Sequence, residues 1–339
     1  MDFTNSGRAA WTRPALLDVT LRDGGLKNQF AFSLDDCVSI AQLAARFGIG
    51  CEVGYYRPRR TQQSGPAVCD KAYLELLRER ASGASLAVMV HTTEVGLDDY
   101  SMLRDAGVRL VRFPTSKTNE AELEWHVEAV RELGIPFSLN LVRVTERSVT
   151  DIAHFARMCA RLDAPIVYFA DSNGGLFPNQ IPALAAALRD ETDATLAFHA
   201  HDNLSLAFAN SLASLKCGFS LLDASLGGLG KGGGNLVLEL IAAHLNTSHG
   251  CQFAVFEMIE LCEQTVSKWL TVEARERFMQ SIFGLLNYNV DTIDRLSNSC
   301  AGRRELFEKL AHEYQRITDR PPPPQGSMKR AFSTEEAKS

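Results

Sequence analysis

Residues 33–55 read SLDDCVSIAQLAARFGIGCEVGY and combine a helical pattern with the strand pattern that follows it. Apolar residues recur at helical spacing over 34–46, and Ser33 with Asp36 has the spacing of a capping box. Gly48 fits the left-handed residue that closes a helix. The run IGCEVGY then shows almost no outward polar alternation. The stretch therefore predicts a helix that leads into a strand buried on both faces, as in a parallel sheet.

The same unit repeats along the chain. Seven further apolar runs have the length and composition of buried strands, at 16–21, 85–90, 108–113, 137–142, 165–170, 195–200 and 221–226. Helical patterns separate them, at 69–80, 97–106, 120–133, 150–162, 180–188 and 204–216. Eight strands that alternate with helices over about 230 residues predict an α/β fold, a (β/α)₈ TIM barrel, at residues 15–247. An open doubly wound sheet is the alternative.

The two ends of the chain differ from this pattern. Residues 1–14 precede the first strand as an N-terminal extension. After 247 no strand candidate follows, and helical spacing at 253–270, 272–287 and 292–317 predicts a small helical C-terminal domain over 251–317. We expect the polar, proline-rich tail at 318–339 to be disordered.

Composition limits the possible functions. With 45% hydrophobic and 22% charged residues, the chain is typical of a soluble globular protein. A net charge of −6 argues against a nucleic-acid partner. We find no signal-peptide pattern and no apolar run long enough for a membrane helix, so we expect a cytoplasmic protein without a membrane partner. Eight cysteines without a CxxC pair predict free thiols.

Two predicted strand ends carry residues suited to a metal. His199 and His201 lie two apart and point the same way, whereas Ala200 points to the other side. Asp23 follows the first strand, and TIM barrels place their active sites at the C-terminal ends of strands. We predict that Asp23, His199 and His201 bind Mn²⁺ or Mg²⁺, with Zn²⁺ possible. The alternative is a pair of hydrogen-bonded core histidines.

Arg22 and the glycine tract add candidates for anion binding. We expect Arg22 to diverge from Asp23 toward a substrate oxygen, with a buried ion pair as the alternative. The tract GGLGKGGGN at 227–235 satisfies GxGxxG, but only helices follow it, which argues against a dinucleotide site. It suits an anionic group or a lid instead. Asn235 is either a fourth metal ligand or a helix N-cap.

Other residues at or near the strand ends are candidates for substrate contacts or proton transfer. The substrate-binding candidates are Gly24, Glu52, Arg112, Asn140, Asp171, Ser172, Gly230 and Lys231. Glu52 and Asp171 are also suited to orienting Arg22 or the ligand histidines. His91 is a candidate general base, with a solvated loop histidine as the alternative.

Three stretches together, TLRDGG at 20–25, HAHDN at 199–203 and GGLGKGGGN at 227–235, resemble the metal-dependent lyases and synthases of the HMGL-like (DRE-TIM) superfamily. The resemblance covers about residues 15–246 and is greatest to the 4-hydroxy-2-oxovalerate aldolases. It implies a carbon–carbon lyase that acts on a 2-oxo acid through a metal-stabilised enolate and releases an aldehyde. It also implies a homodimer whose C-terminal helices contact a partner dehydrogenase.

By position, the resemblance makes Asp23, His199, His201 and Asn235 metal ligands and Arg22 the residue that stabilises the enolate. The chain departs from the aldolases at Leu26, where they carry a general-base histidine.

The base is then His91, a tyrosine such as Tyr288 or a metal-bound water. A Claisen-type synthase that uses acyl-CoA, and a barrel that has lost catalysis and serves as a binding partner, remain as alternatives.

Overall fold

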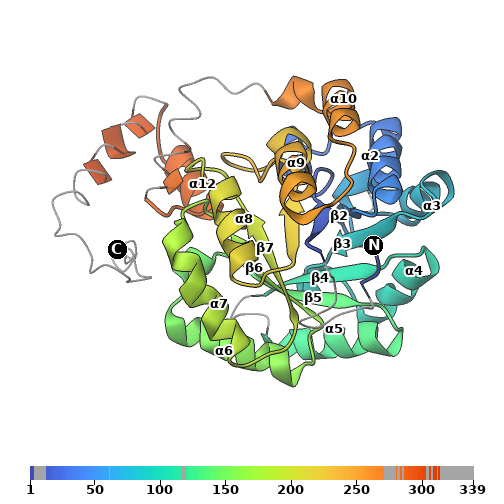
Figure 1. The fold of residues 1–339 in the computed structure, drawn as a ribbon, viewed down its shortest axis with the longest axis horizontal. Helices are drawn as coiled ribbons and strands as arrows, with labels where there is room; N and C mark the ends of the chain where they lie inside the picture. Colours follow the sequence, from blue (N-terminus) through green and yellow to red (C-terminus); the bar gives the residue numbers. More distant parts are fainter. Residues whose placement is uncertain are drawn as a thin grey trace.

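The computed structural model describes residues 1–3, 13–60, 62–115, 120–270, 280, 283–284, 286–302, 305–306, 308–310 and 312–313. Eight parallel strands form a closed barrel in sequence order (Figure 1). They are β1 (Ala15–Asp18), β2 (Gly50–Tyr55), β3 (Ser85–Met89), β4 (Leu110–Thr115), β5 (Phe137–Leu141), β6 (Ile166–Asp171), β7 (Thr195–Ala200) and β8 (Leu221–Ala224). The register from Ala15↔Leu221 to Asp18↔Ala224 joins β8 to β1. The predicted TIM barrel is confirmed, and the open sheet is excluded.

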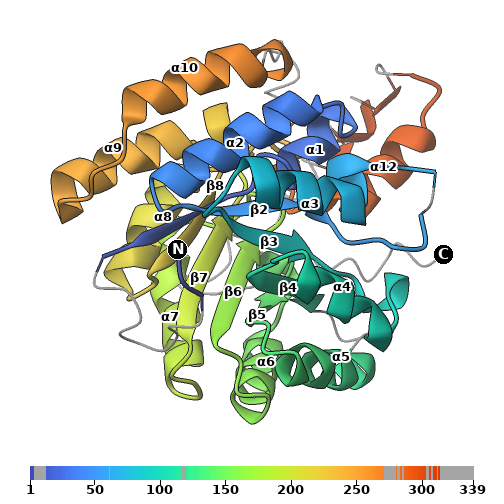
Figure 2. The ribbon, with the colours of Figure 1, turned by 90° about the vertical axis from the view of Figure 1, so that its right-hand side faces the viewer.

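Helices cover the outside of the barrel (Figures 1 and 2). They are α1 (Asp23–Asn28), α2 (Leu34–Arg46), α3 (Lys71–Arg80), α4 (Tyr100–Asp105), α5 (Glu120–Glu132), α6 (Val149–Arg161), α7 (Ile181–Arg189), α8 (Ala207–Lys216) and α9 (Leu238–His249). Short 3-10 helices are η1 (Gly65–Ala67), η2 (Thr92–Glu94), η3 (Leu97–Asp99), η4 (Val144–Glu146), η5 (Pro178–Gln180), η6 (Leu226–Gly228) and η7 (Ser267–Trp269). The predicted capping box is present, because the Ser33 side chain accepts from the Asp36 N–H.

The barrel interior is filled at the end opposite the metal candidates. Leu17, Ala87, Ile166 and Leu221 belong to one buried apolar cluster inside the barrel. Phe3, from the N-terminal extension, is buried in the same cluster. This packing leaves the other end, where the strands terminate, for polar side chains.

One local prediction was wrong, and one alternative is excluded. The first strand ends at Asp18 rather than at residue 21, because the Asp18 carboxylate accepts the Thr20 N–H at 2.7 Å and the chain turns. The Asp23 N–H then donates to the Val19 carbonyl at 2.8 Å, so Asp23 is the first residue of α1. Asn235 does not cap a helix, since α9 begins at Leu238.

Beyond the barrel, α10 (Val255–Thr265) lies beside α2 and α9, and α12 (Val290–Asn298) follows later in the chain (Figures 1 and 2). Most of the helix predicted at 272–287 and the whole tail at 318–339 lie outside the described residues. All eight cysteines are free thiols, as predicted. Among the helices that the structure describes, none has the length and apolar character to cross a membrane.

Candidate metal centre and active site

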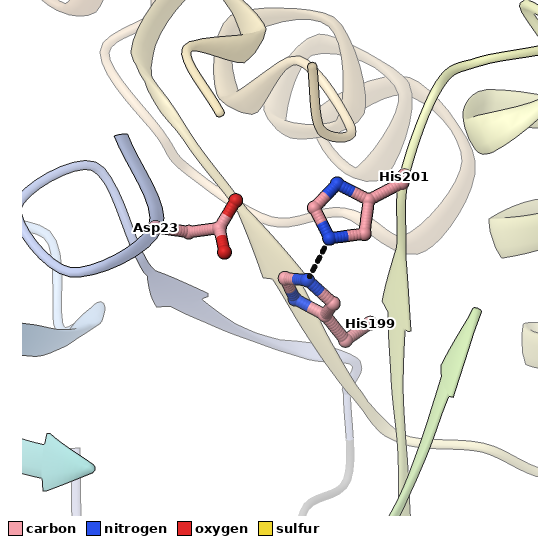
Figure 3. Close-up of side chains that lie close together, drawn as sticks. All are labelled: Asp23, His199 and His201. Atoms are coloured by element: carbon pink, nitrogen blue, oxygen red, sulfur yellow. Dashed lines mark hydrogen bonds between the residues drawn. The ribbon is translucent and has the colours of Figure 1, made fainter. Parts of the chain in front are cut away.

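Asp23, His199 and His201 come together at the mouth of the barrel. The Asp23 side chain projects from the start of α1, and the histidines lie at the end of β7 and directly after it. One ligand atom from each residue lies within 4.8 Å of the others, and all three residues are buried. Figure 3 shows the carboxylate facing the two rings. The three predicted ligands therefore form one compact cluster.

The partners of the two imidazoles fix their protonation. His199 Nδ1 donates to the Asp223 carboxylate at 3.0 Å, and His201 Nδ1 donates to the Gly234 carbonyl at 3.2 Å. Carboxylate and carbonyl oxygens only accept, so both Nδ1 atoms carry a proton. The two Nε2 atoms lie 3.3 Å apart (Figure 3). When both rings are neutral, their lone pairs face each other, an arrangement that a bound cation stabilises.

Asn235 lies against the Asp23 carboxylate. Its Nδ2 donates to Asp23 Oδ2 at 2.9 Å and to the Leu229 carbonyl at 3.1 Å. Its Oδ1 is buried without a hydrogen-bond partner among the described residues. An unpaired buried amide oxygen beside a carboxylate and two imidazoles fits a divalent cation.

The electrostatics of the ligands support the same reading. Burial alone would raise the pKa of Asp23, but Arg22, His201 and His199 hold that pKa well below its usual range. Burial lowers the pKa of His201 to about 4, although Asp23 opposes the shift. At neutral pH the carboxylate is ionised and the His201 imidazole is neutral, which are the forms that bind metals.

Arg22 is held in place rather than diverging from its neighbour. Its Nη1 donates to Asp23 Oδ1 at 2.6 Å, and its Nε donates to Glu52 Oε2 at 2.7 Å. The two carboxylates therefore orient the guanidinium group from two sides. The ion pair expected as the alternative is present, and it includes Asp23 of the three-residue cluster.

Arg112 lies in a buried ion-pair network inside the barrel. It donates to Glu52 Oε2 at 2.7 Å and to Asp223 Oδ2 at 2.6 Å, and its side chain is 1% exposed. The same Asp223 oxygen accepts from His199. Arg112 therefore helps to fix the carboxylate that orients His199, and its guanidinium group is not available to a substrate. Sequence reasoning missed Asp223. Its signal was a charged residue within the otherwise apolar strand run LLDASL.

Tyr55, at the end of β2, was also missed. The His91 ring stacks on Tyr55 with ring centroids 5.9 Å apart, and the Arg22 guanidinium lies 6.0 Å from the same ring. Burial raises the pKa of Tyr55, whereas burial and the charge of Arg57 lower the pKa of His91. His91 is therefore a neutral imidazole close to the side of the site formed by Arg22.

The structure places four other candidates in contacts outside the three-residue cluster. Asn140 Oδ1 accepts from Ser138 at 2.7 Å, and the Ser172 hydroxyl accepts the Arg143 N–H at 2.9 Å. Both Asp171 carboxylate oxygens accept backbone N–H groups, from Gly175 and Leu176. Tyr288 packs on an apolar cluster formed by Phe283, Leu286 and Leu310.

The glycine tract covers the ligands closely. The Lys231 N–H donates to Asp23 Oδ2 at 3.2 Å. A Cβ at Gly230 would lie 2.3 Å from Asn235 Nδ2, and one at Gly24 would lie 2.8 Å from a Leu229 side-chain carbon. Only glycine fits at these two positions without a shift of its neighbours. A cavity of about 270 Å³ borders the tract and is lined by Lys27, Asp202, residues of the tract from Gly227 to Asn235, Val237, Trp269, Leu270 and Gln280.

Comparison with known proteins assigns the family. The HMGL-like family model matches residues 13–265. The chain belongs to the HMGL-like family. This family comprises lyases and synthases, and its curated relatives here are aldolases. The predicted membership is confirmed.

Two relatives and two solved structures illustrate the likeness. The chain is 31% identical to the 4-hydroxy-2-oxovalerate aldolase of Chloroflexus aurantiacus over 264 residues, which cover 75% of this chain and 76% of that protein. It is 31% identical to the enzyme of that name from Thermus thermophilus, over 69% of each chain.

The N-terminal domain of a Bacteroides vulgatus protein superposes with a TM-score of 0.72 at 21% identity, covering 87% of this chain and 99% of that one. Rhizobium etli pyruvate carboxylase superposes with a TM-score of 0.70 at 17% identity, over 93% of this chain and 30% of that one. At these identities the two structures show the fold alone.

Proposed function

We propose that the protein is a divalent-metal-dependent carbon–carbon lyase of the aldolase type, acting on a 2-oxo acid. The observation that carries the proposal is the buried cluster of Asp23, His199 and His201, with its ligand atoms within 4.8 Å of one another and Arg22 against the carboxylate. The relatives named 4-hydroxy-2-oxovalerate aldolase support the same chemistry.

Four side chains would hold the cation: those of Asp23, His199 and His201, with the Oδ1 atom of Asn235. Mn²⁺ and Mg²⁺ suit a set with carboxylate, amide and imidazole donors. A divalent ion bound there supplies Lewis-acid polarisation of the 2-oxo and carboxylate oxygens of the substrate.

Arg22 stabilises the negative charge that develops on the substrate. Glu52 and Asp23 fix its guanidinium group, so the group needs no rearrangement when charge appears on the 2-oxo oxygen. The electron pair of the broken carbon–carbon bond stays on the 2-oxo fragment, next to this fixed cation.

His91 takes the proton that cleavage requires. Leu26 has no proton-transfer group, and His91 stacks on Tyr55 beside Arg22. As a neutral imidazole it accepts the proton of the substrate hydroxyl, while the carbon–carbon bond breaks and the aldehyde leaves.

The test is cleavage of 4-hydroxy-2-oxo acids in the presence of Mn²⁺, with pyruvate measured through lactate dehydrogenase and NADH. We expect turnover that chelation abolishes, and no turnover by a folded His199→Ala variant. His154→Ala is the matched control, because His154 is an exposed surface histidine. Full activity after exhaustive chelation would overturn the proposal. Release of free thiol from acetyl-CoA with a 2-oxo acid, without aldehyde release, would favour a Claisen-type synthase.

A further inference from the structure

The loop after β2 carries three arginines, Arg57, Arg59 and Arg60. Arg57 Nε pairs with Glu94 Oε2 at 2.8 Å, and Arg60 binds the other oxygen of the same carboxylate. Arg59 donates to the Thr93 carbonyl at 3.4 Å. Among the described residues, the ion pairs of Arg57 and Arg60 all go to Glu94. One carboxylate therefore faces two guanidinium groups, and the loop keeps a positive excess.

This positive excess lies next to the candidate active site. The Arg57 guanidinium lies 4.0 Å from the centroid of the Tyr55 ring, and that of Arg22 lies 6.0 Å from it. The two distances limit the separation of the guanidinium carbons to about 10 Å or less. The His91 ring stacks on the same tyrosine. Arg22 and Arg57 therefore contact the same tyrosine, at a separation that one small substrate can bridge.

Partial burial makes the excess charge significant. The Arg57 side chain is 14% exposed and that of Glu94 is 22% exposed, whereas Arg60 is 48% exposed. A cation withdrawn from water and only partly neutralised attracts an anion more strongly than an exposed one does. A planar guanidinium group also matches a carboxylate or phosphate with two parallel hydrogen bonds.

The surrounding charges point the same way. The charges of Arg57, Arg22 and Arg60 all act against protonation of His91, and Glu94 alone among the leading influences favours it. Glu122, the acid on the neighbouring helix, accepts from the Thr92 hydroxyl at 3.3 Å. Among the charges that act most strongly on His91, three are therefore cationic and one is anionic.

We propose that Arg57 and Arg60 form a second anion-binding subsite, and that the substrate carries a carboxylate or phosphate on the half that leaves as the aldehyde. The assignment rests on the proposed aldolase function, which places the 2-oxo half at Asp23 and Arg22. Glu94 positions the two arginines, and the Tyr55 ring lies beside both Arg22 and Arg57.

The experiment compares aldehydes in the condensation direction, with pyruvate and Mn²⁺ held constant. Propanal is the neutral aldehyde, succinic semialdehyde carries a carboxylate and glyceraldehyde 3-phosphate carries a phosphate. We expect the wild-type enzyme to prefer one of the two anionic aldehydes over propanal. Whichever of the two it prefers shows whether the subsite takes a carboxylate or a phosphate. In Arg57→Gln the ratio of kcat/KM for that aldehyde to kcat/KM for propanal should fall about 10- to 100-fold, mainly through KM. Arg60→Gln should show a smaller fall.

Arg78→Gln is the matched control, because Arg78 is an arginine that donates to the Asp105 carbonyl outside the site. It should keep the wild-type ratio. An Arg57→Gln enzyme with the wild-type ratio, or a wild-type enzyme without preference for either anion, would overturn the subsite.

Direct binding separates this inference from the aldolase proposal. Calorimetric titration with inorganic phosphate and with succinate needs no turnover. If no aldehyde is converted but one of these anions binds the wild type more tightly than Arg57→Gln, the aldolase proposal fails and the subsite stands. Equal binding by both proteins would reject the subsite.

Discussion

Asp223→Asn should weaken metal binding although Asp223 is not a candidate ligand. The Asp223 carboxylate accepts from His199 Nδ1 at 3.0 Å and thereby directs the lone pair of Nε2 toward Asp23. An asparagine loses the negative charge that makes the imidazole a stronger ligand. Its NH₂ group cannot accept the Nδ1 proton.

The expected magnitude follows from this geometry. Loss of a carboxylate behind a ligand histidine lowers metal affinity about 10- to 100-fold, or about 1.4–2.8 kcal/mol. The variant should still fold, because Arg112 keeps its ion pair with Glu52 at 2.7 Å. The circular dichroism spectrum checks that condition.

The assay is titration with Mn²⁺, with free aqueous Mn²⁺ measured by electron paramagnetic resonance. Asp70→Asn is the matched control, since the Asp70 carboxylate accepts the Gly65 and Tyr73 N–H groups at the start of α3 instead of a ligand histidine. It should bind Mn²⁺ as the wild type does. A folded Asp223→Asn protein with wild-type Mn²⁺ affinity would show that the Asp223 carboxylate does not strengthen His199 as a ligand.

Three further predictions concern other parts of the molecule. Burial raises the pKa of Asp18 to about 7, so between about pH 4 and 7 the folded state holds a proton on Asp18 that the unfolded state has lost. The free energy of unfolding should therefore fall by up to about 1.4 kcal/mol per pH unit as the pH rises through this range. Chemical denaturation should show a smaller fall in Asp18→Asn, and equal slopes would contradict the shift. Gly230→Ala should displace Asn235 and lower Mn²⁺ affinity in the same titration, whereas Gly302→Ala, with open space around its Cβ, should not. Burial lowers the pKa of His91 below its usual value of 6.5, so kcat/KM should stay level down to about pH 6.5 and fall only below that pH. His91→Asn should lower kcat/KM about 10²- to 10⁴-fold. An unchanged pH profile of kcat/KM in that variant would exclude His91 as the base.

The clustering of the three candidate ligands could be predicted from local rules. The two-residue period of a strand puts the side chains of His199 and His201 on one side, and barrel architecture brings Asp23 to the same end. The start of α1 at Asp23 was not predictable, because it depends on the turn that the Asp18 side chain stabilises.

The network behind the ligands depends on closure of the barrel. Arg112 and Asp223 are 111 residues apart in sequence, and only the assembled strands bring them within 2.6 Å. No periodicity in the sequence indicates such a pair. Arg57 and Glu94 likewise meet because parallel strands β2 and β3 end side by side. Sequence patterns therefore pointed to the three residues of the cluster and missed the residues that position them.

We propose that Asp23, His199 and His201 hold a divalent cation. Diffraction from crystals grown with Mn²⁺, recorded above and below the manganese absorption edge, tests it most directly. We predict one anomalous peak within coordination distance of the Asp23 carboxylate and of Nε2 of both histidines. A peak elsewhere, or none at saturating Mn²⁺, would contradict the account.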